Sequence, residues 1–334
     1  MWDDVQKKPA FEMEFKSQVL AVRLRRDLYI FPSYCADEGL LRCWLDEYMF
    51  IDLIILRISS TPSKLPIMTE VFSYDCIPDL GLCALSPSPT RSLLAFPGRS
   101  PGHVQLVDLT PPFSSSGQLP QHHQNLPTNI SLITAHENRL ACLAVNHAGT
   151  LLASASVHGT LLRVWDTRSC ACLVELRRGV DKADIHSISF SPPLPPPSAS
   201  ATLTPPEDMI AVISDKGTIH IFSLAALSHT PGVTERNKQS SFATPILGSL
   251  LPKYFQSRWG FAKAHVPVES KYELFKLGWW GEGEGVVVIG RDGGWWKFSV
   301  PKGQFAGVKS GEGQSEGECK EIGYKRYLNV GRDG

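Results

Sequence analysis

The chain has 334 residues, of which 43% are hydrophobic, and its basic and acidic residues balance at a formal net charge of zero. This length can bury a sizeable core in one large or two modest domains. A neutral balance argues against bulk electrostatic attraction to nucleic acid, so any anion binding must be local.

Cysteine usage and the apolar runs favour a cytoplasmic protein that contacts membranes only peripherally. The eight cysteines are scattered without a Cys-x-x-Cys pair, which fits reduced thiols better than a disulfide framework or a zinc site. The first residues lack the basic-then-apolar pattern of a signal peptide. The longest apolar stretch, Tyr48 to Ile58, includes Asp52 and Arg57 and is too short to span a bilayer.

In chain order, short β-rich runs alternate with Gly, Pro, Ser and Asp, and helical periodicity is scarce. An isolated strand is expected at Phe11 to Phe15. Pro32 to Arg57 then interrupts the pattern as an atypical insertion, in which we expect no propeller strand pair. Four copies of a three-strand unit follow, at 82–85, 93–96 and 104–108; 140–145, 151–156 and 161–166; 185–190, 209–214 and 218–222; and 274–277, 286–289 and 295–298.

Each copy, completed by a less regular fourth strand, is the unit of a propeller blade. Val164-Trp165-Asp166 is also close to the Trp-Asp signature of WD repeats. We therefore predict an all-β fold, a WD-repeat β-propeller of about five recognisable blades plus a partial one, as a single domain over residues 1–330. Within it, Ser191 to Pro206 is a proline-rich loop between two strands of one blade, and Ala225 to Arg258 is a long polar insertion before a fourth strand.

Two adjacent arginines form the most informative local motif, Leu176-Arg177-Arg178-Gly179. They follow an extended apolar run, in which successive side chains point to opposite faces, so Arg177 and Arg178 are expected to serve two different pockets. The planar guanidinium suits phosphate because it donates two parallel hydrogen bonds. Gly179 is expected to let the chain turn away without a Cβ in the way. The alternative is a solvated charge pair at a strand end.

The chain resembles the PROPPIN family of β-propellers, which bind polyphosphoinositides. The family hallmark is Phe or Leu followed by Arg-Arg-Gly, present here as Leu176 to Gly179. The wider resemblance rests on further segments, at 81–87, 94–98, 135–136, 159–164, 214–222, 251–255 and 317–319. Two departures stand out. Trp2 to Asp27 resembles the end of a second blade, so we expect the first blade and part of the second to be absent, and Pro32 to Arg57 has no family counterpart.

The resemblance implies two shallow rim pockets flanking the arginines. The two flanking repeat copies carry equivalent polar residues, with one extra residue in the first hairpin. The first pocket combines Arg177 with His136, Ser156, Thr160 and Arg163, and the second combines Arg178 with Ser214, Lys216, Thr218 and His220. Such side chains suit a phosphorylated inositol. As alternatives, a serine or threonine here is only a turn residue, and His136 is the structural histidine of a WD repeat.

The insertion from Ala225 to Arg258 fits the membrane-inserting loop of the family. Its apolar side chains, near Lys253 and Arg258, suit contact with anionic lipid headgroups; they are Phe242, Ile246, Leu247, Leu250 and Leu251. The alternative is a polar loop with scattered hydrophobic residues. Two pockets and one inserting loop reinforce each other because the later contacts become intramolecular.

The resemblance implies a non-enzymatic effector of phosphatidylinositol 3-phosphate and phosphatidylinositol 3,5-bisphosphate. It acts on vacuolar, endosomal or pre-autophagosomal membranes, with autophagy or vacuolar proteins as partners. The rival hypothesis is a protein-interaction scaffold without lipid binding. No catalytic or cofactor constellation is apparent. Gly281 to Gly285 carries acids where a phosphate loop needs donors, and His122-His123 lacks partner ligands for a metal.

Overall fold

The computed structural model describes residues 2–3, 7–9, 19–25, 28–34, 50–57, 67–75, 81–110, 130–193, 209–224, 258–268, 274–301 and 317–326. Every regular element in these ranges is a β-strand, as predicted. The chain divides into two compact units, which are described separately: Met1–Cys83 with Pro97–Ser100, and Ala84–Phe96 with Pro101–Gly334. The expected strand at Phe11 to Phe15 lies outside the described residues.

The smaller unit contains one four-stranded antiparallel sheet and one two-stranded sheet. The four-stranded sheet has the order β3 (Arg23–Arg25), β4 (Leu28–Tyr34), β5 (Phe50–Arg57) and β6 (Ile67–Asp75). The two-stranded sheet pairs β1 (Trp2–Asp3) with β2 (Lys8–Pro9). Together with the four sheets of the larger unit, these give five blade-sized sheets and a partial one.

The expectation that Pro32 to Arg57 contains no strand pair is wrong. The end of β4 pairs with β5 across this segment, with Pro32 opposite Leu53 and Tyr34 opposite Ile51. Proline argues against a central strand because it cannot donate to the ladder. Here β3 pairs with β4 only as far as Ile30, so Pro32 lies where β4 pairs with β5 alone and the proline is tolerated.

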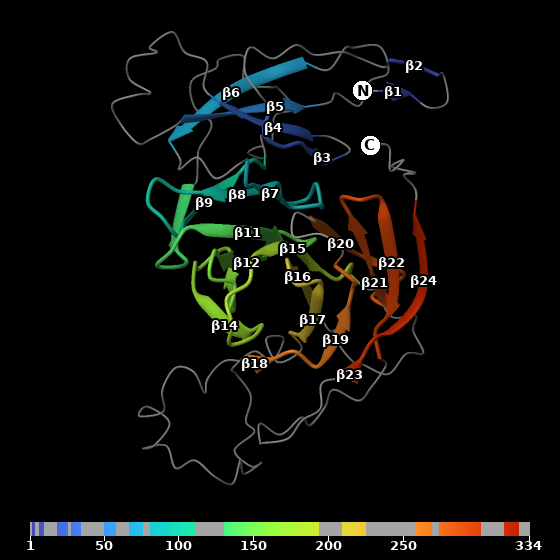
Figure 1. Ribbon diagram of the computed structural model, residues 1–334. Helices are drawn as coiled ribbons and strands as arrows, with labels where there is room; N and C mark the ends of the chain where they lie inside the picture. Colours follow the sequence, from blue (N-terminus) through green and yellow to red (C-terminus); the bar gives the residue numbers. More distant parts are fainter. Residues whose placement is uncertain are drawn as a thin grey trace, which may run out of the picture. The chain divides into compact units, whose positions relative to one another are not determined.

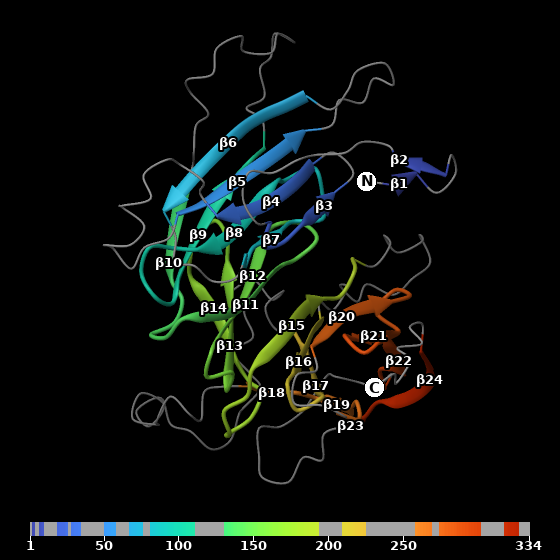
Figure 2. The same cartoon turned by 45° about the horizontal axis from the view of Figure 1, so that its top comes forward.

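The larger unit consists of four antiparallel sheets whose strands follow one another in chain order (Figures 1 and 2). Each sheet is named here by its first strand. The strands are β7 (Ala84–Leu85), β8 (Leu93–Pro97), β9 (His103–Asp108) and β10 (Ile130–Thr134); β11 (Leu140–Val145), β12 (Leu151–Ser156), β13 (Leu161–Asp166) and β14 (Cys172–Arg177); β15 (Ile185–Phe190), β16 (Met209–Ser214), β17 (Thr218–Ser223) and β19 (Ala262–His265); and β20 (Phe275–Trp280), β21 (Gly285–Gly290), β22 (Gly294–Ser299) and β24 (Lys320–Arg326). All four predicted three-strand copies are therefore confirmed, and each is completed by a fourth strand.

Two short parallel strands extend the β11 and β15 sheets. The strand β18 (Arg258–Trp259) pairs with β14, and β23 (Gly317–Glu318) pairs with β19. Each lies just before the outer strand of the following sheet, so the chain covers the edge of one blade before it completes the next. Covered edges cannot template pairing with other chains.

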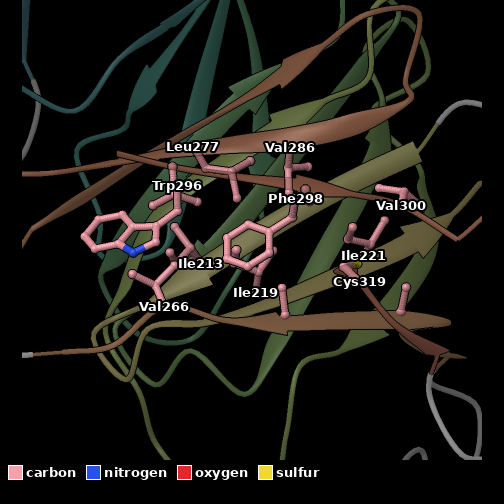
Figure 3. Close-up of a cluster of buried hydrophobic side chains, with 14 of the residues drawn as sticks. Ile213, Ile219, Ile221, Val266, Leu277, Val286, Trp296, Phe298, Val300 and Cys319 are labelled. Atoms are coloured by element: carbon pink, nitrogen blue, oxygen red, sulfur yellow. The ribbon is translucent and has the colours of Figure 1, made fainter. Parts of the chain in front are cut away.

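Apolar side chains fill the spaces between successive blades. Between the β11 and β15 sheets, Leu162, Val164 and Leu176 pack with Val212 and Phe222. Between the β15 and β20 sheets, a second cluster unites Ile213, Ile219, Val286, Trp296 and Phe298 (Figure 3). Because side chains alternate between the two faces of a strand, the β15 sheet contributes one face to each of the two clusters. Full burial of one such side chain stabilises the fold by about 1.5–3 kcal/mol.

Candidate functional site

The paired arginines end β14 and are both buried. Leu176 points into the apolar cluster shared with the β15 sheet, so Arg177 and Glu175 lie on the opposite face of the strand. Arg177 is 8% and Arg178 6% exposed. Because a solvated pair would be exposed, the alternative of a simple surface charge pair does not hold.

Arg178 is fixed against the turn between β12 and β13. Its backbone N–H donates to the carbonyl of Thr160 at 3.0 Å, and its Nε donates to the carbonyl of Gly159 at 2.8 Å. Its Nη2 also contacts the carbonyl of Asp181. Burial lowers the pKa of the guanidinium, while Asp215 and Asp181 oppose that shift. The charge is therefore held in place by backbone oxygens.

The two predicted pockets begin from equivalent hairpin turns. Gly159 donates its N–H to the Ser156 carbonyl at 2.9 Å, and Gly217 donates to the Ser214 carbonyl at 3.0 Å. Both glycines have positive φ, 61° and 69°. A Cβ at Gly217 would lie 2.3 Å from the Val266 carbonyl oxygen, so neither the conformation nor the space allows a side chain.

Among the residues predicted for the first pocket, Arg163 already donates hydrogen bonds to its neighbours. Its Nε donates to Glu175 Oε1 at 2.8 Å, and its Nη1 donates to the Ala135 carbonyl at 2.6 Å. Glu175 is its cross-strand partner on β14. Ser156 is buried and Thr160 is half-buried. The residues predicted for the first pocket therefore include a cation, Arg163, that Glu175 already neutralises.

His136 belongs to a buried hydrogen-bond network. Its Nε2 lies 2.9 Å from Ser154 Oγ, to which the Nε1–H of Trp165 also donates at 3.0 Å. The Trp165 indole can only donate, so Ser154 Oγ accepts from it, and the same hydroxyl also holds His136 Nε2 in place. Burial first, and then the nearby Arg163, lowers the pKa of His136 to about 4. This arrangement matches the structural alternative that the sequence left open for His136.

In the second pocket, His220 faces other cations. Register pairs it with Val212 on β16 and with Lys263 on β19. Burial, followed by Arg178 and Lys263, lowers the pKa of its imidazole to about 4. The pocket also includes two polar atoms that are buried without a hydrogen-bond partner, Ser214 Oγ and His220 Nδ1. Thr218 starts β17 on the same face, and Lys216 is exposed in the turn.

Register confirms the equivalence of Arg163 and His220 and adds two residues that the sequence did not single out. Lys263 and His265 lie on β19 directly opposite His220 and Thr218, and both are exposed. Alternation with the buried Ala262, Ala264 and Val266 is the signal that could have identified them. It was obscured because this strand follows the long insertion.

The expectation for Gly179 is wrong. A Cβ at this position would meet nothing within 4 Å, and its φ lies outside the left-handed region. Among the described residues, therefore, no backbone or packing requirement at position 179 explains the glycine.

The residues predicted to insert into a membrane lie outside the described residues, between β17 and β18. The strand β18 returns from that segment beside the arginine pair, with Arg258 opposite Leu176 and Trp259 opposite Arg177. Trp259 is 50% exposed. An exposed tryptophan at the base of the insertion is a further feature that the sequence analysis missed.

Comparison with known proteins assigns the family. The sequence profile of the PROPPIN family matches residues 15–235. The chain belongs to the PROPPIN family. It is 33% identical to "SVP1-like protein 2" of Pichia angusta over 90% of this chain and 70% of that protein. It is also 29% identical to "Autophagy-related protein 18e" of Arabidopsis thaliana, over 88% of this chain and 62% of that protein.

Solved PROPPIN structures share the fold. Hsv2 of Kluyveromyces lactis with its complete loop 6CD superposes with a TM-score of 0.61 at 20% identity, covering 97% of this chain and 79% of that one. The structure of KlAtg21 in complex with the coiled coil of AgAtg16 superposes with a TM-score of 0.54 at 16% identity, covering 98% and 76%. The all-β, WD-repeat propeller predicted from the sequence is thus the fold of this PROPPIN.

Proposed function

We propose that this PROPPIN is a non-enzymatic effector that binds phosphatidylinositol 3-phosphate and phosphatidylinositol 3,5-bisphosphate through the pockets flanking Arg177 and Arg178. One observation carries the proposal. Arg178 and Lys263 both act on His220, whose Nδ1 is buried without a hydrogen-bond partner, as is Ser214 Oγ on the neighbouring strand β16. Buried polar groups are normally hydrogen-bonded, and a phosphate supplies both the acceptor oxygens and the charge that such a pocket lacks.

Membrane recruitment would be peripheral. Across the described part of the chain, no helix is long and apolar enough to cross a bilayer. The exposed Trp259 and Arg258 beside Arg177 are side chains that suit a headgroup layer. Headgroup pockets and the proposed inserting loop, which carries Phe242 and Leu247, would then bind one membrane together and gain avidity.

The cellular role we propose is recruitment to vacuolar, endosomal or pre-autophagosomal membranes. The name of the Arabidopsis relative supports a place in autophagy. The KlAtg21 complex supports a protein partner from the same process, because there a propeller of this fold engages a coiled coil. A scaffold that engages proteins without lipid is the rival function.

Cosedimentation with vesicles separates the two functions. Phosphatidylcholine vesicles with and without phosphatidylinositol 3-phosphate are mixed with the wild-type chain, with Arg177→Ala/Arg178→Ala, and with Arg168→Ala. Arg168 is exposed in the turn after β13, so its loss controls for charge alone. We expect the wild type and Arg168→Ala to pellet with phosphoinositide and the double variant to stay soluble. If none of the three pellets with phosphoinositide, the scaffold is supported instead, and equal pelleting of all three with phosphoinositide would refute the role of the arginine pair.

A further inference from the structure

The β20 sheet has one packed face and one face that we call the open face. On the packed face, Val286, Trp296 and Phe298 point into the cluster shared with the β15 sheet and are buried (Figure 3). Because side chains alternate along a strand, the neighbours of these residues point to the opposite side. The open face on that side carries Trp280 on β20, Val287 and Ile289 on β21, and Trp295 and Lys297 on β22.

The side chains of the open face lie in rows across the strands. Val287 lies opposite Lys297, and Ile289 lies opposite Trp295. Lys297 Nζ stands 3.6 Å from the centroid of the Trp280 ring, which confirms that these two side chains share the face. Among the described residues, neither of the two apolar clusters between blades includes any of the five, and Ile289 is 44% exposed.

Two glycines flatten the middle of the open face. Gly278 lies beside Val287 from β20, and Gly323 lies beside Lys297 from β24. A Cβ at either position would meet nothing within 4 Å, so the row is uncovered at both of its ends. A sheet face with aromatic and aliphatic side chains is normally buried against another layer. The open face therefore has the shape and the composition of an interface for a second sheet.

The two ends of the open face carry opposite charge. Glu282 and Glu284 are exposed in the turn between β20 and β21, within the Gly281 to Gly285 segment. Arg291 is exposed in the turn between β21 and β22, and the exposed Lys325 lies opposite Trp295 at the same end. Other charges on β24 are balanced at each end: Lys320 by Glu321 at the acidic end, and Arg326 by Asp292, 2.8 Å away, at the basic end.

This charge distribution makes the open face complementary to itself. If two copies pack face to face about a two-fold axis that crosses the strands, the acidic end of each copy meets the basic end of the other. A two-fold axis parallel to the strands would bring like charges together, which is costly. Identical chains associate most often through such a two-fold interface, in which the same patch is used by both.

We infer that the open face is the interface of a homodimer, in which two β20 sheets pack face to face with their strands antiparallel. Trp280, Val287, Ile289 and Trp295 would supply the apolar contact, while Glu282 and Glu284 of each copy would face Arg291 and Lys325 of the other. The inference does not depend on lipid binding, because none of these residues belongs to the predicted pockets.

Sedimentation velocity of the full chain at a series of protein concentrations tests the inference. The wild type should shift from monomer to dimer as the concentration rises. Ile289→Asp should raise the dissociation constant of the dimer at least about tenfold, because it places a carboxylate in the apolar contact. Leu173→Asp is the matched control: Leu173 is 41% exposed but lies on β14 in another sheet, so this variant should dimerise like the wild type.

Charge reversal tests the antiparallel arrangement. Glu282→Lys/Glu284→Lys alone and Arg291→Glu/Lys325→Glu alone would each place like charges at both contacts, so each should stay monomeric. An equimolar mixture of the two should form dimers, because each variant then offers the charge that the other lacks. All four side chains are exposed, so these variants should fold, and this arm stands even where Ile289→Asp disturbs β21.

Three results would overturn the inference. A wild type that stays monomeric at every concentration would show that no second copy covers the open face. A dimer that Ile289→Asp leaves intact would place the interface elsewhere on the chain. Charge-reversed variants that remain monomeric when mixed would rule out the antiparallel pairing of the two ends.

Discussion

Acid should destabilise this PROPPIN through His136, by an amount that follows from its burial. His136 is 7% exposed, and its pKa falls from 6.5 to about 4. Between these pH values the unfolded state binds more protons than the folded state. The contribution of neutral His136 to the free energy of unfolding is therefore fully present above pH 6.5 and is lost as the pH falls towards 4. The full loss is about 3 kcal/mol, and about 2 kcal/mol of it is lost by about pH 5.

Urea unfolding at about pH 7.5 and about pH 5 measures this loss. The variants are His136→Gln, which keeps a polar side chain near Ser154 without a titrating ring, and His147→Gln, which changes an exposed histidine. Between these two pH values, the free energy of unfolding should fall by about 2 kcal/mol less in His136→Gln than in the wild type. His147→Gln should fall as far as the wild type. An equal loss in His136→Gln and the wild type would refute the assignment of a neutral, buried His136.

Three further predictions concern the turns, the buried network and the second pocket. Gly217→Ala should lower the free energy of unfolding by at least ~1 kcal/mol because position 217 has a positive φ and lies close to the Val266 carbonyl. Gly179→Ala should be tolerated. Equal melting temperatures of the two variants would contradict this. Ser154→Ala should cost about 1–3 kcal/mol because the buried Nε1–H of Trp165 loses its acceptor, which urea unfolding of the variant would measure. Vesicle binding should be tighter at about pH 6 than at about pH 7.5, since a bound phosphate raises the pKa of His220 and binding takes up a proton; pH-independent binding would argue against phosphate beside that ring.

The strands of the larger unit could be predicted because their alternation and turn residues are local signals. The runs at 140–145, 151–156 and 161–166 coincide with β11, β12 and β13. The same reasoning failed in the smaller unit at Pro32 to Arg57, where no propeller strand pair was expected although the end of β4 pairs with β5. Sequence patterns identify elements well when the composition of each element agrees with its tertiary surroundings.

The site was harder to predict because its balance of positive and negative charge depends on which residues lie opposite each other on neighbouring strands. The Arg-Arg-Gly motif led to two hairpin turns and to Arg163 and His220, which occupy equivalent positions in their sheets. Whether each of those residues faces a carboxylate or an ammonium depends on which residue of the outer strand lies opposite. Glu175 and Lys263 become visible as partners only once that pairing is known. The glycine at 179, in contrast, attracted a conformational explanation that the backbone does not require.

The most direct measurement of the central claim is an NMR titration of the histidine side chains with inositol 1,3-bisphosphate at about pH 6. Without ligand, His136 and His220 should both be neutral because burial holds each pKa at about 4. Adding the headgroup should bring His220 to the imidazolium form and leave His136 neutral. If His220 stays neutral at saturating headgroup, or if His136 protonates in its place, the phosphate does not bind where this account puts it.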